Sequence, residues 1–403
     1  MIEHGPYKQE ITNNLDFYKA TMSQLAYEKA PEAVVEFKLT NRNADNLAEA
    51  VNISELQDRL NCIQEKNFSD DEIKYLASLD NSTTPMFNAD YLSYLKNGQL
   101  PNVSVEYDHS TNDLSVKTNG RWPMVSFWET VVMSEINELY FERLAREQNI
   151  DVMDLYNMGL KKLNAKIQTL KQNPDIKIAD FGTRRRFSYR WHKFVVEALA
   201  QELPEQFMGS SNIGLSKIIG KKPIGTFAHE MPMVYAALAE QNGQDIKESH
   251  GKMLDDWYEK YGQNLSIALT DTFGSDFFFN DFNYDRAKNW NGLRQDSGDP
   301  IQFGEQAVKY YQTQNIDPKS KIIVFSDGLN IDDIVNINNH FKGQIKTAYG
   351  WGTSLTNDLG LPALNIVMKA VKVNDTETVK LSDSPGKHSG SSENVKRYQN
   401  VFA

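Results

Sequence analysis

The sequence predicts an α/β protein with a parallel α/β barrel and a second α/β domain formed from both chain ends. From about residue 171 onwards, short apolar runs repeatedly end in Gly, Asp, Arg, Ser or Thr and lead into helical stretches. This unit recurs about seven times at spacings of roughly 20 to 35 residues, which is typical of a parallel barrel, with a doubly wound open sheet as the alternative. The first 170 residues lack this order, and alternation returns after residue 365. We therefore expect residues 171–355 to form the barrel domain, and residues 1–170 with 356–403 to form the other.

Length and charge limit the possible classes of function. A chain of 403 residues is too long for one ordinary hydrophobic core, and its hydrophobic content of 40% is that of a globular protein. The 43 basic and 54 acidic residues give a net charge of −11, which disfavours sequence-independent binding to nucleic acid or to an anionic membrane. Any anionic ligand must therefore be bound by locally clustered Arg, Lys and backbone N–H groups.

Cysteine usage and the N-terminal residues predict a cytoplasmic location. Cys62 is the single cysteine, which excludes an intramolecular disulfide and a cysteine-based metal site. Residues 1–6 do not begin a leader with a basic and then an apolar region, and no run of about 18 apolar residues occurs. We expect a chain that neither spans a membrane nor is exported.

Helical and alternating patterns organise the first part of the chain. Apolar residues at helical spacing predict a helix over residues 15–27, whose first turn, with Asp16, Tyr18 and Lys19, faces either the core or an active site. The other elements expected here are a strand over 33–39, a turn over 40–43, helices over 53–78 and 90–97, a hairpin of strands 103–107 and 114–117, and helices over 123–147 and 151–170.

Strands and helices alternate in the second part. Each expected strand is a short apolar run, so the polar residues after it would lie together on one rim of a barrel. Strands are expected over 176–181, 206–208, 224–228, 265–269, 292–293, 322–325 and 345–349, and helices over 189–200 and 231–240. A last strand over 366–373 is expected to return to the N-terminal domain.

His229 ends the apolar run 224–228 and precedes an expected helix, so we expect its imidazole at a strand tip. Taken alone, such a histidine is more often a hydrogen-bonded structural residue than a catalyst. The repetition of polar strand tips reverses that expectation, because a barrel brings the tips together. The residues expected to converge are His229, Asp271, Arg294, Asp296, Asp327 and Gly352.

Two segments predict phosphorylated ligands. Residues 349–354 offer glycine backbone that phosphate oxygens can approach closely, with Thr353 and Ser354 as additional donors. The triplet of arginines at 184–186 is the densest positive charge in the chain, and it suits phosphate or carboxylate groups. The alternative for this triplet is a solvated basic loop.

Carboxylates follow several of the same apolar runs. Asp271, Asp296 and Asp327 would lie beside the phosphate-binding groups, where carboxylates hold Mg²⁺ or ribose hydroxyls, because a hard cation prefers oxygen ligands. Asp299 precedes Pro300 and is instead the expected cap of a helix. We therefore expect Mg²⁺ as a cofactor, with no ligand set assigned.

Six motifs occur in order over nearly the whole chain. They are LDFYKATM at 15–22, DFGTRRR at 180–186, GTFAHE at 225–230, LRQDSGDP at 293–300, FSD at 325–327 and LSDSPGK at 381–387. Each motif alone is modest, but as a set they resemble those of the nicotinate phosphoribosyltransferase family.

This resemblance implies a type II phosphoribosyltransferase fold, in which an incomplete parallel α/β barrel joins a domain made from both chain ends. The protein would be a homodimer with shared active sites. It would transfer the 5-phosphoribosyl group from phosphoribosyl pyrophosphate to nicotinate, giving nicotinate mononucleotide and pyrophosphate for NAD biosynthesis. ATP would be a co-substrate, with its hydrolysis coupled through transient phosphorylation of His229.

The resemblance also implies roles in binding the base. Phe181 matches the aromatic residue that stacks on the pyridine ring, and Tyr18 matches one that reaches in from the neighbouring subunit. Arg184 and Arg294 are expected to bind the nicotinate carboxylate, with Ser211 as a nearby hydrogen-bond donor. Ser211 stands where nicotinamide-using relatives have an aspartate, and the missing charge favours the acid over the amide.

Further roles concern catalysis and the sugar phosphate. Asp271 and Asp296 are expected to act with His229 in catalysis. Ser210 stands where the family is expected to have threonine, and this change keeps the hydroxyl group. Ribose or phosphate groups are expected to be bound by Asp327, Gly328, Gly352, Thr353, Arg42 and Lys387.

Two other interpretations stay open. Nicotinamide or quinolinate could replace nicotinate, although Ser211 argues against the first and a phosphorylatable His229 argues against the second. The barrel could also serve as a ligand sensor without turnover, although the complete set of polar residues expected on its rim argues against that interpretation.

Overall fold

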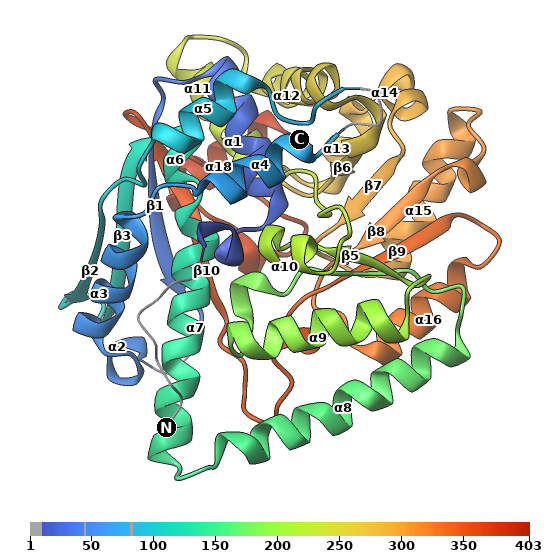
Figure 1. The fold of residues 1–403 in the computed structure, drawn as a ribbon. Helices are drawn as coiled ribbons and strands as arrows, with labels where there is room; N and C mark the ends of the chain where they lie inside the picture. The colour runs from blue at the N-terminus through green and yellow to red at the C-terminus, as the bar shows by residue number, and fades with distance from the viewer. Residues whose placement is uncertain (1–9, 44–45, 81–83) are drawn as a thin grey trace.

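Two β-sheets organise the molecule (Figure 1). The computed structural model describes residues 10–43, 46–80 and 84–403. The expectation that residues 1–6 do not begin a leader falls outside these described residues. An antiparallel sheet has the strand order β11-β10-β1-β3-β2, and a parallel sheet has the order β5-β4-β9-β8-β7-β6. The strands are β1 Val34–Asn41, β2 Val103–Asp108, β3 Asp113–Arg121, β4 Ile178–Asp180, β5 Phe207–Ser210, β6 Ile267–Leu269, β7 Gly292–Gln295, β8 Ile322–Phe325, β9 Lys346–Trp351, β10 Ile366–Val373 and β11 Thr376–Glu377.

Helices surround both sheets, and many begin at a side-chain cap. Asp299 accepts a hydrogen bond from the backbone of Gln302 and is followed by Pro300, which confirms the expected cap. The helices are α1 Phe17–Lys29, α2 Leu47–Ala50, α3 Ile53–Gln64, α4 Asp70–Ser78, α5 Ala89–Asn97, α6 Trp122–Val125, α7 Trp128–Glu147, α8 Val152–Gln172, α9 Tyr189–Glu202, α10 Ile213–Ile218, α11 Glu230–Gln241, α12 Ile246–Tyr261, α13 Ser275–Asp281, α14 Tyr284–Asn289, α15 Pro300–Thr313, α16 Ile331–Phe341, α17 Thr353–Thr356 and α18 Ser392–Val401.

Segments from both chain ends build the antiparallel sheet. β1 lies between β3 and β10, and its register with β10 runs from Val35 opposite Val373 to Asn41 opposite Ile366. The hairpin of β2 and β3 is confirmed. This pairing supports a domain of residues 1–170 with 356–403 beside one of residues 171–355, and we keep those boundaries as a proposal.

The parallel sheet carries the expected succession of strands and helices. The three residues of β4 are all buried, as a strand covered on both faces requires. α9 packs against β5 and α16 against β9. β5 and β6 are the edges, and within the described residues no strand pairing joins them. The mixed α/β fold, with its parallel sheet and separate N-terminal domain, is confirmed.

The expected strand over residues 224–228 is wrong. This segment lies beside the tip of β5, where the N–H of Ile224 donates to the carbonyl of Ser210 at 2.9 Å, and it passes close to α1. Its apolar character has another cause, because Phe227 is fully buried against Trp257. His229 therefore lies at the residue before α11 and not at a strand tip, whereas the helix expected over 231–240 is confirmed.

Two expected helices are interrupted. The stretch over 53–78 divides into α3 and α4, because Ser69 and Glu72 form a capping box that starts a new helix. The stretch over 123–147 divides into α6 and α7. β1 also extends through Asn41, so the turn expected over 40–43 begins later.

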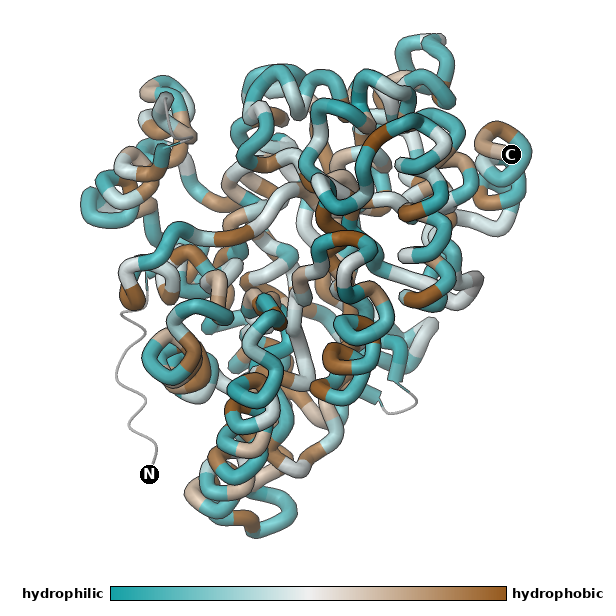
Figure 2. The backbone as a smooth tube through the Cα atoms, turned by 90° about the vertical axis from the view of Figure 1, so that its right-hand side faces the viewer, coloured by the Kyte–Doolittle hydropathy of each residue, from teal (hydrophilic) through white to brown (hydrophobic). Residues whose placement is uncertain are grey.

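Hydropathy alternates along the outer helices, as Figure 2 shows, so these helices turn one face to the core and one to solvent. In the part of the chain that the structure describes, every helix is too short or too polar to cross a membrane.

Candidate active site

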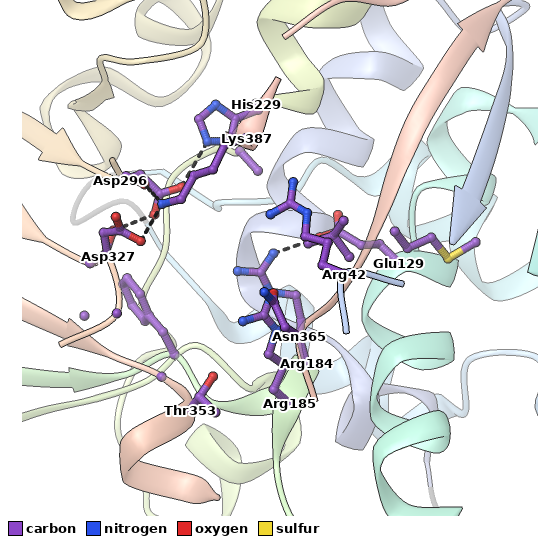
Figure 3. A pocket seen from close by; sticks show the side chains of 18 of the residues that line it. Arg42, Glu129, Arg184, Arg185, His229, Asp296, Asp327, Thr353, Asn365 and Lys387 are labelled. Carbon is purple, nitrogen blue, oxygen red and sulfur yellow. Dashed lines mark hydrogen bonds and ion pairs between the residues drawn. The ribbon is translucent and has the colours of Figure 1, made fainter. Parts of the chain in front are cut away.

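A cavity of about 1230 Å³ lies between the two sheets (Figure 3). One wall comes from the carboxyl ends of β7, β8 and β9, and the opposite wall comes from β1 and β10. Carboxyl ends of parallel strands are where α/β folds bind ligands. A second, smaller pocket of about 230 Å³ adjoins it, and Phe181, Arg184 and Arg294 line both.

The smaller pocket, which we call the base pocket, brings together all five residues expected to bind the base. It is lined by Tyr18, Phe181, Arg184, Ser211 and Arg294, with Asp16 and residues 223–226 among the others. The Arg294 guanidinium lies 5.8 Å from the centre of the Phe181 ring. The arrangement offers aromatic surface for a flat ring and two cations for an acid group.

Tyr18 reaches this pocket from the same chain. This differs from the expectation that the ring reaches in from a neighbouring subunit, because α1 of the chain itself lies beside the tips of β4 and β5. The N–H of Phe17 donates to the carbonyl of Ser211 at 2.6 Å and fixes this position. The first turn of α1 thus faces the pocket at Asp16 and Tyr18.

Ser211 has a different partner from the one expected. Its hydroxyl donates to Asp16 Oδ1 at 2.6 Å, so it is not free to donate to a ligand. Burial raises the pKa of Asp16, and the charge of Arg184 opposes this shift. The carboxyl group of Asp16 therefore lies beside Ser211. The absence of an aspartate at position 211 does not by itself decide whether the pocket binds nicotinate or nicotinamide.

The three arginines at 184–186 have separate environments. Arg184 donates to Glu129 Oε1 at 2.9 Å and faces the base pocket. Arg185 lines the large cavity and donates to the carbonyl of Ile366 at 2.9 Å. Arg186 is fully buried and pairs with Glu138 at 2.8 Å. The interpretation as a solvated loop is wrong, because the triplet belongs to the walls and the core.

His229 lies among four polar groups. Its Nδ1 is 2.9 Å from Thr272 Oγ1, and its Nε2 is 3.0 Å from both Asp296 Oδ2 and Lys380 Nζ. Asp271 Oδ1 is 3.7 Å from the same Nε2. His229, Asp296 and Lys380 line the cavity, whereas Thr272 is 1% exposed, so Nε2 is the nitrogen on the cavity side.

The charges around His229 are nearly balanced. Burial lowers the pKa of His229, and the Lys380 ammonium lowers it further, so the imidazole stays unprotonated near neutral pH. Burial opposes ionisation of Asp296, but the Arg294 guanidinium 2.9 Å away holds its pKa well below the usual range. The site therefore presents a neutral imidazole beside ionised carboxylates.

His229, Asp271 and Asp296 are a candidate metal-binding group. Their potential ligand atoms lie within 4.8 Å of one another. Asp271 Oδ1 is buried and has no hydrogen-bond partner among the described residues, although Ser297 donates to its Oδ2 at 2.6 Å. An orphaned carboxylate oxygen beside a second carboxylate fits a hard cation such as Mg²⁺.

The residues expected to bind ribose and phosphate all line the large cavity: Arg42, Asp327, Gly328, Gly352, Thr353 and Lys387. Lys387 Nζ donates to Asp327 Oδ1 at 2.6 Å and to the carbonyl of Asp296 at 3.1 Å (Figure 3). Gly350 has a different use, because a Cβ there would lie 2.3 Å from the ring of Phe181. It leaves room for the aromatic ring.

Sequence reasoning missed several charged residues of the cavity. Lys380 stands one residue before the LSDSPGK motif, and Lys369 and Glu129 lie in a strand and a helix without any motif. Burial lowers the pKa of Lys369 to about 7, and the nearby Arg42 and Lys380 add to the effect. Alternation along β10 gives the only sequence signal for Lys369, since it places the side chain on one face of the strand.

A buried ion network joins the base pocket to the start of α11. Lys19 is fully buried, and its Nζ lies 2.5 Å from both Glu129 Oε2 and Glu230 Oε2. Glu230 also accepts a hydrogen bond from Trp122 at 2.6 Å. Because Glu129 holds Arg184 and Glu230 follows His229, the network fixes both sides of the site relative to each other.

Comparison with known proteins agrees with this geometry. The model of the nicotinate phosphoribosyltransferase family matches residues 176–403, and that of its N-terminal domain matches residues 14–137. The chain is 37% identical to a nicotinate phosphoribosyltransferase of Chromobacterium violaceum over 392 residues, covering 95% of this chain and 94% of that one.

Crystal structures of two further relatives have the same fold. The nicotinate phosphoribosyltransferase of Porphyromonas gingivalis superposes with a TM-score of 0.87 at 30% identity, covering 98% of this chain and 99% of that one. That of Vibrio cholerae gives a TM-score of 0.88 at 29% identity, covering 98% and 95%. The chain belongs to the nicotinate phosphoribosyltransferase family, whose members are enzymes.

Proposed function

We propose that the protein transfers the 5-phosphoribosyl group from phosphoribosyl pyrophosphate to nicotinate, and that this transfer is coupled to ATP hydrolysis through a phosphate carried by His229. The observation that supports this most directly is the pairing of two sites. A base pocket with two aromatic rings and two arginines opens into a larger, cation-lined cavity that contains the histidine. The products are nicotinate mononucleotide and pyrophosphate, and the compartment we expect is the cytoplasm.

In this proposal the base pocket binds nicotinate. Phe181 and Tyr18 contact the pyridine ring, while Arg184 and Arg294 bind the carboxylate. Arg184 donates to Glu129 at 2.9 Å. Arg294 donates to Asp296 at 2.9 Å, to Ser326 Oγ at 2.8 Å and to the carbonyl of Phe227 at 3.5 Å. The N–H groups that these contacts leave over on each guanidinium can donate to the ligand. The ring nitrogen then needs only correct orientation towards the anomeric carbon of the sugar.

The large cavity binds the sugar diphosphate. Asp327 and Gly328 hold ribose hydroxyls, and Gly352 and Thr353 hold phosphate at the end of β9. Arg42 and Lys369 add positive charge on the opposite wall, and Lys387 adds it beside Asp327. Displacement of pyrophosphate builds positive charge on the sugar and negative charge on the leaving group, so fixed cations around the diphosphate stabilise the transition state.

His229 accepts the γ-phosphoryl group of ATP. The neutral imidazole has two tautomers. If Nε2 carried the proton, it would donate to Asp296, whereas an unprotonated Nε2 accepts a hydrogen bond from Lys380. Only the unprotonated Nε2 has a lone pair that can act as a nucleophile on the cavity side. The proton of the ring then lies on Nδ1 and is donated to Thr272. The Nε2 lone pair forms the N–P bond while the P–O bond to ADP breaks.

Asp271 and Asp296 would hold Mg²⁺ when it is bound, and the ion would neutralise phosphate charge. The free Oδ1 of Asp271 supports this assignment. The implied homodimer stays part of the proposal. Because the chain supplies its own Tyr18 to the base pocket, we do not propose that a partner provides this ring.

Nicotinamide is the second candidate base. The Asp16 carboxylate at 2.6 Å from Ser211 could accept a hydrogen bond from an amide, which a carboxylate ligand cannot donate. The two arginines still favour the acid, since both line the base pocket and can donate to a ligand carboxylate with N–H groups that their own partners leave over. The base must therefore be tested directly.

The test uses purified protein, γ-labelled ATP and Mg²⁺, with wild type compared with His229→Ala. We expect an acid-labile, base-stable label on wild type alone, discharged as mononucleotide forms from nicotinate and phosphoribosyl pyrophosphate. Formation of mononucleotide without any label on the protein would support the transferase activity and reject its coupling to ATP hydrolysis through His229. Product from nicotinamide but not from nicotinate would reject the proposed base, and neither label nor product would favour a sensor.

A further inference from the structure

A fully buried cluster of Asp180, His192 and Ser210 lies directly beneath the base pocket. The exposed fraction of each side chain is 0%. Asp180 is the last residue of β4, immediately before Phe181, and Ser210 is the last residue of β5, immediately before Ser211. The cluster therefore lies at the point where two neighbouring strands deliver their residues to the pocket.

One carboxylate accepts hydrogen bonds from three separate elements. Asp180 Oδ1 accepts from the N–H of Gly182 at 2.8 Å, in the turn that leads to Arg184. Oδ2 accepts from the hydroxyl of Ser210 at 2.5 Å and from His192 Nε2, on α9, at 2.7 Å. Hydrogen bonds to an ionised group are stronger than those between neutral groups, and burial excludes water as a competitor.

The hydroxyl of residue 210 has two tasks. While it donates to Asp180, it accepts from the N–H of Asn212 at 2.9 Å, and so closes the turn that carries Ser211. The carbonyl of Asp180 also accepts from the N–H of Ser211 at 2.8 Å. Both serine and threonine can perform these tasks, which gives a physical reason for a hydroxyl residue at this position.

We propose that Asp180 is the positioning residue of the base pocket, because it holds the turn of Phe181 and Arg184 in register with the turn of Ser211 through the Ser210 hydroxyl. Asp180 touches no ligand itself. It acts through the distance between the two turns, which sets the width of the pocket. His192 supports the carboxylate from below and leaves its own Nδ1 without a partner among the described residues.

The effect should fall on nicotinate far more than on the sugar diphosphate. The cluster fixes residues of the base pocket, whereas Asp327, Gly352 and Lys387 belong to other strand ends and to the C-terminal segment. A loss of general stability would instead lower the folded fraction and leave the two Michaelis constants in their original ratio. The inference rests on the proposed assignment of the base pocket.

The experiment compares steady-state kinetics of Asp180→Asn, Ser210→Ala and Ser210→Thr in the full chain. We expect the first two to raise the KM for nicotinate by about 10- to 100-fold, because Asp180→Asn removes the buried charge that accepts the hydrogen bonds and Ser210→Ala removes one of the donors to it. The KM for phosphoribosyl pyrophosphate should change less than about threefold. Ser210→Thr should stay within about threefold of wild type. Asp175→Asn is the matched control, because this carboxylate precedes the same strand at its opposite end and pairs with Asn338 at 3.0 Å.

Equal increases in both Michaelis constants, or an unchanged nicotinate KM in Ser210→Ala, would overturn the positioning role. If Asp180→Asn does not fold, Ser210→Ala and Ser210→Thr decide the matter. Phe181→Leu is measured alongside, because it tests the pocket itself. An unchanged nicotinate KM in Phe181→Leu would reject both the assignment of the base pocket to nicotinate and the role of Asp180. A raised nicotinate KM in Phe181→Leu, together with a wild-type nicotinate KM in Ser210→Ala, would reject only the role of Asp180.

Discussion

At the scale of single residues, the charge balance beside His229 controls its chemistry. Asp271 and Asp296 are matched by Lys380 and Arg294, so the imidazole faces no net charge when it is neutral. Arg294 and Asp296 belong to one motif, whereas Asp271 and Lys380 come from other parts of the chain. Removal of one cation would leave an excess of carboxylate, which favours a protonated histidine that cannot act as a nucleophile.

Lys380→Met should lower the rate of phosphoryl transfer from ATP to His229 by about 100-fold, the usual loss for one donor at a transition state. The acid limb of the pH profile should also move to higher pH, because the Lys380 charge lowers the pKa of His229 in wild type. Quenched-flow labelling with γ-labelled ATP measures both effects. Lys321→Met is the control, since this lysine is also buried but does not line the cavity: its ammonium donates to two backbone carbonyls and lies over the ring of Tyr311. A wild-type rate in Lys380→Met would exclude the role of this ammonium.

Lys369 should make the affinity for the sugar diphosphate depend on pH. Its pKa of about 7, lowered by burial and by Arg42 and Lys380, means that it loses its charge as the pH rises above 7. The KM for phosphoribosyl pyrophosphate should then rise by up to about tenfold per pH unit between pH 7 and 9. Lys369→Arg should keep a low KM at pH 9, since arginine stays charged, and Lys369→Met should give a flat profile. If the KM for phosphoribosyl pyrophosphate still rises with pH in Lys369→Met, a titrating group other than Lys369 causes the pH dependence.

At the scale of elements, the ends of neighbouring strands determine the shape of the base pocket. β4 lies between β5 and β9, so Phe181 leaves the sheet with Ser211 on one side and Gly350 on the other. The ring of Phe181 occupies the space that a side chain at 350 would need. Gly350 lines the large cavity, and its missing side chain leaves the space that the Phe181 ring of the base pocket occupies.

Gly350→Ala should raise the KM for nicotinate by about tenfold, because the new methyl group would displace the Phe181 ring from its place in the pocket. The KM for the sugar diphosphate should change little. Gly386→Ala is the control, since this glycine also lines the large cavity but has open space around its missing Cβ. Nicotinate titrations followed by tryptophan fluorescence report the affinity, and equal effects of the two variants would contradict the steric cause.

At the scale of the whole molecule, the C-terminal segment connects the two sheets. β10 pairs with β1, and the residues after β11 then cross to the parallel sheet and bring Lys380 and Lys387 to the cavity. α18 secures this crossing, because Phe402 stacks on Phe273 with ring centres 4.0 Å apart. The cavity is complete only when both chain ends are folded.

Mixing two inactive variants tests whether sites are shared between subunits. If Tyr18→Ala and Phe181→Ala are unfolded together, refolded and shown to exchange by differently tagged copies, we expect no recovery of activity. In the structure both rings come from one chain, so no mixed assembly restores a complete base pocket. Recovery to about a quarter of wild type, the statistical share of complete sites when a dimer exchanges its Tyr18 segments, would show that the partner supplies this ring.

The sequence alone determined the α/β class, most strands of the parallel sheet and the residues that meet at their ends. This was possible because alternation, helical spacing and caps are local properties, and because a parallel sheet brings strand ends together whatever their separation in sequence. This rule correctly placed Arg294, Asp296 and Asp327 on one wall of the cavity. It does not explain the position of His229, which was expected there from a strand that the structure does not contain.

Only the tertiary structure decided which partner each polar group has. Residues 224–228 are as apolar as a strand but bury Phe227 in a loop, and the hydroxyl of Ser211 turns to Asp16, 195 residues away. Lys380 reaches His229 across 151 residues. Local patterns carry no information about such contacts, because burial and charge pairing depend on which elements the fold brings together. An apolar run in the sequence shows only that its side chains must be buried, not which residues bury them.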